Sequence, residues 1–263
     1  MSRLAQALLL LLLLLQSAAW AQPALQIYAM DSRPVSFGSG EQADGLVVEV
    51  ARQVQQRIGT HDRIQVIPWA RANTLAATEP NVLLLSIVPT PQRAQYLRFV
   101  GPLFNSRISG LALRSRATEL RARDPGLHTL RAGARRGSIF LSQARGSGYN
   151  VMDETGATDN ALKMLMMGRF DLWFEGEEIA FGSIEAAGLK PEDLQVMVRL
   201  STQPVYFAFS RDTPDAVVQA WDAALAGMKR DGSYQRLLQK WLPGAELPPQ
   251  AHPPPLKQRR AVR

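Results

Sequence analysis

Segments typical of β-strands alternate with segments typical of amphipathic helices, and this alternation restricts the fold more than any other feature of the sequence. Residues 24–30 (ALQIYAM), 63–69 (RIQVIPW) and 82–88 (VLLLSIV) are strand-like apolar runs. Between the first two, DGLVVEVARQVQQRIG spaces apolar residues four positions apart, which predicts a helix with Asp44 as N-cap and Gly59 as its stop. ARANTLAA predicts a short helix before the third run. This order predicts a parallel α/β lobe.

A second set of the same kind follows a strand at residues 108–115 (ISGLALRS) that leads out of the first lobe. Its segments are TLRAGARRGSIFLSQA, NALKMLMMG, FDLWF, EEIAFGSIEAAG and LQVMVRL. PVYFAFS, residues 204–210, predicts a strand returning to the first lobe, followed by two helices with Thr213 as N-cap and Gly232 as the break. The expected fold is α/β, with two lobes joined by a two-strand hinge and a ligand cleft between them.

The predicted lobes have the following boundaries. The first part of lobe 1 covers residues 22–113, and the inserted lobe 2 covers residues 114–205. The return strand and the C-terminal helices cover residues 206–245 and are expected to pack on lobe 1. Residues 246–263 are basic and rich in proline, which predicts a disordered tail.

The N-terminal segment MSRLAQALLLLLLLLQSAAWAQ predicts export. Arg3 precedes an apolar stretch and an A-x-A cleavage site, so residues 1–21 are expected to be a signal peptide and the mature chain to begin near Gln22. The apolar stretch is shorter than the roughly 20 residues that a membrane span needs. The chain has no cysteine, hence no disulfide, thiolate metal site or cysteine for a lipid anchor. These features fit a freely diffusing periplasmic protein.

Charge and motif content disfavour two further classes of function. The formal net charge is +7, but five of the positive charges lie at the chain ends (Arg3, Lys257, Arg259, Arg260 and Arg263). Without a basic stripe interleaved with aromatic residues, nucleic-acid binding is not expected. His61, His128 and His252 belong to no motif, and no Ser-His-Asp pattern, metal-ligand spacing or phosphate loop occurs. We therefore expect no catalytic residues, no metal and no cofactor.

Seven short motifs follow one another in the order RPVSF, GLVVEV, PWAR, TPQRAQYLRFVGP, RRGSIF, GRFD and DGSYQRLLQKW. With these motifs the chain resembles, from about residue 25 to 242, the periplasmic solute-binding proteins of the amino-acid (polar) transport family, bacterial solute-binding protein family 3. The resemblance implies a periplasmic binding protein-like fold without enzymatic activity. It also implies a monomer that binds a small molecule, an amino acid or organic acid, and presents it to the membrane permease of an ABC importer.

The resemblance assigns a carboxylate site. In the family, the arginine of T-P-x-R forms a paired salt bridge with the ligand carboxylate, and Arg93 holds that place. A guanidinium is always charged and offers planar, paired donors, although an arginine in a polar loop is also commonly solvated. Ser86 lies where the family places another donor, whereas Val88 replaces a serine or threonine that many amino-acid binders carry. Gly137 and Ser138 resemble the family's helix start, whose N–H groups meet the same carboxylate.

The other side chains assigned by the resemblance leave alternatives open. Phe37 and Trp69 occupy places where the family puts aromatic residues around the ligand, and core packing is the alternative for both. Family members that bind α-amino acids carry an aspartate about five residues after the G-R-x-D aspartate, but this chain has Gly176 there, between Glu175 and Glu177. One of these glutamates would bind the ligand ammonium group, or the ligand lacks a free α-amino group.

Three further side chains near these motifs are less well defined. Arg135 and Arg136 flank the helix start; we expect each to be solvated, and the alternative is that one of them reaches the cleft. Trp173 faces either the cleft or the core.

Two alternative functions remain at this point. A sensor or accessory binding protein without its own importer would have the same sequence features. A dehydratase-like periplasmic enzyme on the same fold would need a general acid or base in the cleft.

Overall fold

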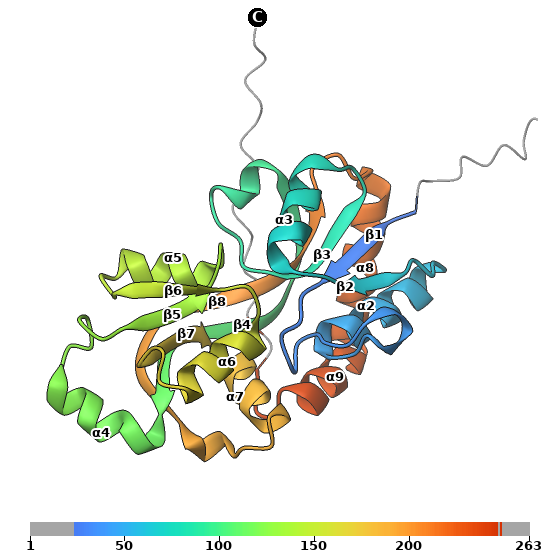
Figure 1. The fold of residues 1–263 in the computed structure, drawn as a ribbon. Helices are drawn as coiled ribbons and strands as arrows, with labels where there is room; N and C mark the ends of the chain where they lie inside the picture. Colours follow the sequence, from blue (N-terminus) through green and yellow to red (C-terminus); the bar gives the residue numbers. More distant parts are fainter. Residues whose placement is uncertain (1–23, 247, 249–263) are drawn as a thin grey trace, which may run out of the picture.

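The computed structural model describes residues 24–246 and 248 (Figure 1). The predicted signal peptide and almost all of the predicted tail lie outside these residues. Eight strands form one mixed sheet in the order β2-β1-β3-β8-β4-β7-β5-β6. The strands are β1 Gln26–Ala29, β2 Ile64–Val66, β3 Val82–Ile87, β4 Leu97–Leu113, β5 Ala132–Arg135, β6 Val151–Thr155, β7 Leu172–Gly176 and β8 Leu194–Ser210.

One end of the sheet forms the core of the first lobe. β1 pairs in parallel with β2 on one side and β3 on the other. Parallel neighbours need crossover connections, and the helices α2 (Leu46–Ile58) and α3 (Trp69–Thr78) supply them. The buried residues of α2 recur every three to four positions, so one face of the helix packs on the sheet: Leu46, Val47, Val50, Ala51 and Val54.

The opposite end of the sheet forms the second lobe (Figure 1). β5 lies between β6 and β7 and is parallel to both. The helices of this lobe are α4 Arg114–Arg123, α5 Ile139–Gly146, α6 Thr158–Met166 and α7 Glu177–Ala186. Helix α4 is absent from the sequence prediction, since only two of its residues, Ala117 and Leu120, are buried and it has no apolar stripe.

Two strands, β4 and β8, run through both lobes. They pair antiparallel from Leu97↔Ser210 to Leu113↔Leu194, with a register shift between Val100 and Phe104. β3 pairs with the end of β8 in the first lobe, and β7 pairs with β4 from Ile108 onward in the second. Between these pairings the sheet is only two strands wide. The sequence predicts a two-strand connection but ends the first part of lobe 1 at residue 113. In the structure, Ile108 to Leu113 of β4 belong to the second lobe, so the narrow segment lies before Ile108.

The prediction of two separate strands at residues 194–200 and 204–210 is wrong, because β8 is continuous. Pro204 does not end it. Pro204 lies opposite Asn105 of β4, outside the stretch of β8 that pairs with β3. Because β8 has no strand on its other side at this point, a missing N–H facing that open side is tolerated.

The last two helices, α8 (Asp215–Arg230) and α9 (Ser233–Trp241), pack against α2 of the first lobe. Arg57 Nη2 of α2 lies 2.7 Å from Asp231 Oδ2. Trp221 of α8 is 1% exposed and packs edge-on against Phe207 and Phe209 of β8, with ring centroids 5.4 and 5.8 Å apart. The chain thus leaves the first lobe, forms the second and returns.

The helix ends agree with the sequence in part. Gly59 ends α2 in the left-handed conformation, and Gly232 separates α8 from α9, as predicted. Asp44 is not the N-cap of α2: Gly45 holds that position, and Asp44 Oδ1 accepts a hydrogen bond from Gly45 N at 2.8 Å. The N-cap of α8 is Pro214 rather than Thr213, whose side chain is buried against Ser210.

Candidate functional site

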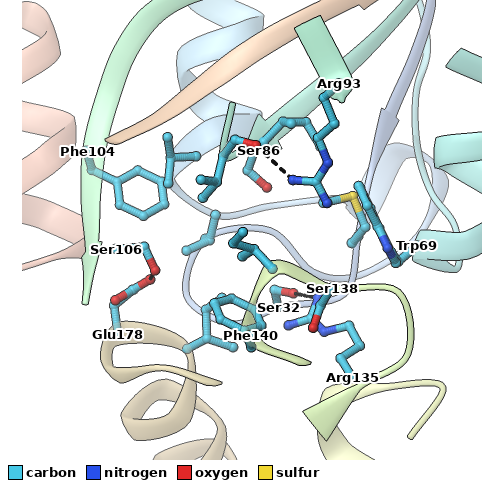
Figure 2. Close-up of a pocket in the computed structure, with 17 residues that line it drawn as sticks. Ser32, Trp69, Ser86, Arg93, Phe104, Ser106, Arg135, Ser138, Phe140 and Glu178 are labelled. Carbon is cyan, nitrogen blue, oxygen red and sulfur yellow. Dashed lines mark hydrogen bonds between the residues drawn. The ribbon is translucent and has the colours of Figure 1, made fainter. Parts of the chain in front are cut away.

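A pocket lies between the two lobes, beside the narrow part of the sheet (Figure 2). The space between its walls is about 510 Å³, part of which is open to solvent. Its walls come from both lobes and from the two connecting strands: Met30, Ser32, Val35, Trp69, Ser86, Ile87, Val88, Arg93, Phe104, Ser106, Arg135, Ser138, Ile139, Phe140, Glu178, Ile179 and Val205.

Arg93 projects into this pocket from the loop after β3. Its Nη1 donates to the Val88 carbonyl at 2.8 Å, and its guanidinium carbon lies 4.9 Å from the centre of the Trp69 ring. Within the described chain, no carboxylate comes within 4.0 Å of the guanidinium. Burial lowers the pKa of Arg93, since the charge is removed from water without an ionised partner. An anion in the pocket would relieve that cost.

Trp69 and Gly137 join the lobes across the pocket. The indole Nε1 of Trp69, at the start of α3, donates to the Gly137 carbonyl at 3.0 Å. Gly137 has a φ of 65°, in the left-handed region that favours glycine. A Cβ there would lie 3.5 Å from Trp69 Nε1, an ordinary contact. The backbone conformation, rather than lack of space, requires glycine at this position.

Two more contacts bring the lobes together. Arg135 Nη1 of the second lobe donates to Ser32 Oγ of the first at 2.9 Å. Helix α7 meets the loop after β1 so closely that a Cβ at Gly182 would lie 2.5 Å from Pro34 Cδ. The pocket is therefore enclosed by lobes in direct contact.

Replacing Trp69 by phenylalanine tests the role of the indole N–H. We expect ligand affinity to fall by about 0.5–1.5 kcal/mol, the net value of one hydrogen bond, because the closed arrangement loses its Trp69–Gly137 contact. The ring face beneath Arg93 is retained, so the unliganded protein should unfold at nearly the same temperature. Binding calorimetry and thermal unfolding measure the two effects. An unchanged affinity would show that this contact does not stabilise closure.

Ser138 begins helix α5 as predicted. Its Oγ accepts a hydrogen bond from Leu141 N at 3.2 Å, so the serine is the N-cap. The serine also lines the pocket, which brings the positive end of the α5 dipole to the same side as Arg93 (Figure 2).

Arg135 is not solvated, contrary to the sequence expectation. It is 6% exposed and lines the pocket, while Arg136 is exposed and lies 3.6 Å from Glu154. Arg135 Nη2 pairs at 2.8 Å with Oε2 of Glu175, which is 0% exposed. β5 and β7 are adjacent, so the two side chains meet on one face of the sheet. Burial raises the pKa of Glu175, and Arg135 opposes that rise.

Glu178, a residue the sequence reasoning missed, lines the pocket at its other end. Ser106 Oγ of β4 donates a short hydrogen bond to Glu178 Oε1. Burial raises the pKa of Glu178 to about 7, with a small further contribution from Glu175. The three-glutamate run EGEE is the signal in the sequence, but which of them faces the pocket depends on where β7 ends and α7 begins.

Two predicted site residues lie elsewhere. Phe37 packs edge-on against Trp241 at 5.7 Å, with the Arg33 guanidinium 3.8 Å from its ring centre. The ring positions around the pocket belong to Phe104 and Phe140 instead.

Glu177 is the second predicted site residue that lies away from the pocket. It is 2% exposed and accepts hydrogen bonds from Ser109 Oγ and Arg199 Nε, both at 2.7 Å. It thus binds the connecting strands and not the pocket. Trp173, which was expected in either the cleft or the core, is fully buried in the core of the second lobe.

The predicted residues fall into three groups. Those that line the pocket are Arg93, Ser86, Ser138 and Trp69. Those that touch its lining residues from outside are Gly137, through Trp69, and Glu175, through Arg135. Those that lie apart from it are Phe37 and Glu177.

The sequence profile of the bacterial extracellular solute-binding proteins, family 3, matches residues 26–244. The chain belongs to this family. Among curated protein sequences, none matches the chain. The predicted fold class, a periplasmic binding protein-like α/β fold with two lobes, is confirmed.

Solved structures of similar fold come from proteins with different roles. An amino acid ABC transporter substrate-binding protein from Streptococcus pneumoniae, bound to L-arginine, is 19% identical, with a TM-score of 0.71 over 86% of this chain and 97% of that one. A histidine kinase sensor domain is 20% identical, with a TM-score of 0.70 over 86% and 99%. An ancestral amino-acid-binding protein, a precursor of cyclohexadienyl dehydratase, is 18% identical, with a TM-score of 0.69 over 83% and 94%. At these identities the likeness establishes the fold.

Proposed function

We propose that this protein captures a small carboxylate-bearing metabolite, an amino acid or related compound, between its lobes in the periplasm and delivers it to an ABC importer. Arg93 carries the proposal. It is a guanidinium that faces an enclosed pocket, has no carboxylate partner within the described chain and lies near the N-terminus of α5. Paired guanidinium donors match the two oxygens of a carboxylate.

Closure follows from the same geometry. The ligand carboxylate would contact Arg93 from the first lobe and the start of α5 from the second, so it favours the closed arrangement by binding it more tightly than the open one. Apolar walls and the rings of Phe104 and Phe140 exclude water from the bound ligand. We propose that the protein acts as a monomer on the permease of the importer.

A thermal-shift screen of amino acids, other carboxylates and amines tests this function. A ligand at one hundred times its dissociation constant stabilises the folded state by about 2.7 kcal/mol, which is a readily measured shift. Carboxylates are expected to stabilise the protein, and amines without a carboxylate are not. A set of hits that all lack a carboxylate would contradict the proposal.

The place of action is the periplasm in this proposal. Within the part of the chain that the structure describes, none of the helices has the length and apolar character that a bilayer crossing needs. We expect the exported protein to begin near Gln22, because the A-x-A site ends at residue 21. Mass spectrometry of a periplasmic extract measures this, and an intact Met1 would contradict it.

Glu178 favours a second candidate function, an enzyme of the dehydratase type. Its pKa near 7 is that of a glutamate able to donate or accept a proton at neutral pH, and it lies in the pocket. Incubating a ligand from the screen with the protein and analysing it by mass spectrometry separates the two functions. A binding protein returns the ligand unchanged, and an enzyme converts it.

A sensor without its own importer is the third candidate. The likeness in fold to a histidine kinase sensor domain supports it. The neighbouring genes distinguish a sensor from a transport protein. Genes for permease and ATPase subunits favour transport, and a gene for a kinase or cyclase favours signalling.

A further inference from the structure

The two ends of the pocket carry opposite charges (Figure 2). Arg93, Arg135 and Ser138 lie at one end, and Glu178 and Ser106 lie at the other. Arg93 lacks a carboxylate partner in the described chain. Glu178 likewise takes part in no ion pair between described residues, and its side-chain partner is the Ser106 hydroxyl. A ligand can therefore neutralise both ends only if it carries an anion at one end and a cation at the other.

Apolar side chains separate the two ends. The wall between them is formed by aliphatic and aromatic residues from both lobes and the connecting strands: Val35, Ile87, Ile139, Phe140, Ile179 and Val205. Figure 2 draws mostly carbon-only side chains between the labelled ends, with the hydroxyl groups of Ser86 and Ser32 nearer the Arg93 end. A charged or strongly polar group placed here would lose its hydration without a partner, which is costly. The middle of the ligand should accordingly be a hydrocarbon chain.

An α-amino acid does not fit this pattern. Its ammonium group is one carbon away from its carboxylate, so both groups would lie near Arg93. Two carboxylates lie near Arg135 at this end, Glu175 and Asp31. Glu175 is 0% exposed and accepts hydrogen bonds from Arg135 Nη2 and Gly176 N, and Asp31 lines an adjoining cavity rather than this pocket. Arg135 is already paired with Glu175, so Arg93 is the charge without a carboxylate partner at this end of the described pocket. Among the residues that line the pocket, none at this end would offer the ammonium group a carboxylate, while Glu178 would be left without a cation.

We propose that the pocket binds a linear ω-amino carboxylate, with its carboxylate at Arg93, its methylene chain along the apolar wall and its terminal ammonium group against Glu178. This inference rests on the proposed function and narrows its ligand class. The Ser106 hydroxyl holds the Glu178 carboxyl in place for the ammonium group.

Matched ligands test the proposal by titration calorimetry. The probes are 4-aminobutanoate, 5-aminopentanoate and 6-aminohexanoate, which vary the distance between the charged ends. L-Norvaline is an isomer of 5-aminopentanoate with the ammonium group moved to the α-carbon. Hexanoate carries a methyl group in place of the terminal ammonium group of 5-aminopentanoate. We expect the best ω-amino acid to bind roughly 10- to 100-fold more tightly than L-norvaline or the hydrocarbon analogue of its own length, the range for one charge-assisted contact.

A pair of variants assigns the preference to one side chain. Glu178→Gln keeps the shape and the Ser106 contact but removes the charge, so the preference over the hydrocarbon analogue should disappear. Glu185→Gln is the matched control, since Glu185 is exposed on the same helix and does not line the pocket. It should retain the full preference. Unfolding temperatures without ligand verify that both variants are folded.

The pH dependence gives a second readout. The charged residues that surround Glu178 on β4, β7 and its own helix are Arg107, Glu175, Glu177 and Glu185. The free Glu178 carboxyl is mostly protonated at about pH 6 because its pKa is about 7, and an ammonium ligand lowers that pKa, so binding should release a proton. As the pH is raised toward 7, the affinity for the ω-amino acid should increase by up to about tenfold per pH unit, and above pH 7 it should level off. Hexanoate should not show this rise.

Three results would overturn the inference. They are an affinity for L-norvaline equal to or above that of every ω-amino acid, an undiminished preference in Glu178→Gln, and no measurable binding of any ω-amino acid. None of them contradicts the proposed function, provided that some carboxylate binds and that the affinity depends on Arg93. An affinity for every carboxylate that survives Arg93→Ala would instead contradict the proposed function.

Discussion

Replacing Arg93 by alanine is expected to weaken ligand binding by about 2–5 kcal/mol, because the ligand carboxylate would be left in an enclosed pocket without its partner. The fold should tolerate the change, since the side chain hydrogen-bonds to the Val88 carbonyl and to Tyr96 and forms no ion pair within the described chain. Unfolding without ligand should change by about 0.5 kcal/mol or less. Titration calorimetry with the best carboxylate from the screen measures the loss.

Two comparisons sharpen the Arg93 result. Arg93→Lys keeps the charge but not the paired, planar donors, so it should also bind poorly. Arg71→Ala removes an exposed arginine from helix α3 outside the pocket and should leave the affinity unchanged. If Arg93→Ala binds as tightly as the unaltered protein, the carboxylate lies elsewhere and the family's arginine has lost its role in this chain.

The largest expected effect on stability comes from Glu175→Leu, at about 3–5 kcal/mol. The change leaves the guanidinium of Arg135, which is 6% exposed, without the carboxylate that lies 2.8 Å from it. Combining Glu175→Leu with Arg135→Met replaces the pair by apolar side chains and should restore most of the lost stability. Urea unfolding without ligand measures both variants.

Ligand binding separates the two roles of Arg135. The double variant should fold but bind the ligand weakly, since the cationic end of the pocket then consists of Arg93 and the start of α5. If the double variant is as unstable as Glu175→Leu, the buried charges of Arg135 and Glu175 do not compensate each other. Full affinity in the double variant would show that Arg135 makes no contribution to the ligand site.

Local signals predicted part of the site. Ser138 follows a glycine and precedes an apolar run, so its role as an N-cap can be read from neighbouring residues alone. Arg93 follows a buried strand in a loop with two prolines. In a parallel α/β lobe this position lies at the carboxyl ends of the strands. Both depend on residues within a few positions in the sequence, and the structure places both side chains in the pocket.

The acidic end depends on the exact boundary between a strand and a helix. Side chains alternate along β7, so Glu175 lies on the same face of the sheet as Arg135 of the neighbouring strand, and successive residues at the start of α7 differ by about 100° in direction. A shift of one residue in that boundary changes which glutamate faces the pocket. Glu177 contacts the connecting strands and Glu178 the pocket. No local pattern fixes such a boundary.

Arg135 and Phe37 illustrate the limits set by distant contacts. Arg135 is buried because Glu175, forty residues later, lies on the adjacent strand. Phe37 is turned toward Trp241, which the returning C-terminal helices bring beside it. Neither partner can be identified from the residues nearby in the sequence. From the sequence alone, Arg135 is expected to be solvated and the ring of Phe37 to face the cleft or the core.

The narrowing of the sheet to two strands has a mechanical consequence. Each lobe is stiffened by at least three neighbouring strands and by the helices packed on them, whereas the segment between them consists of β4 and β8 alone. A two-stranded ribbon twists more readily than a wide sheet, so bending strain concentrates there and both lobes keep their shape. Phe104, Ser106 and Val205 belong to this compliant segment and also line the pocket. A molecule in this pocket would therefore rest against the pivot itself, where a small displacement would be amplified into a large movement of the lobe tips.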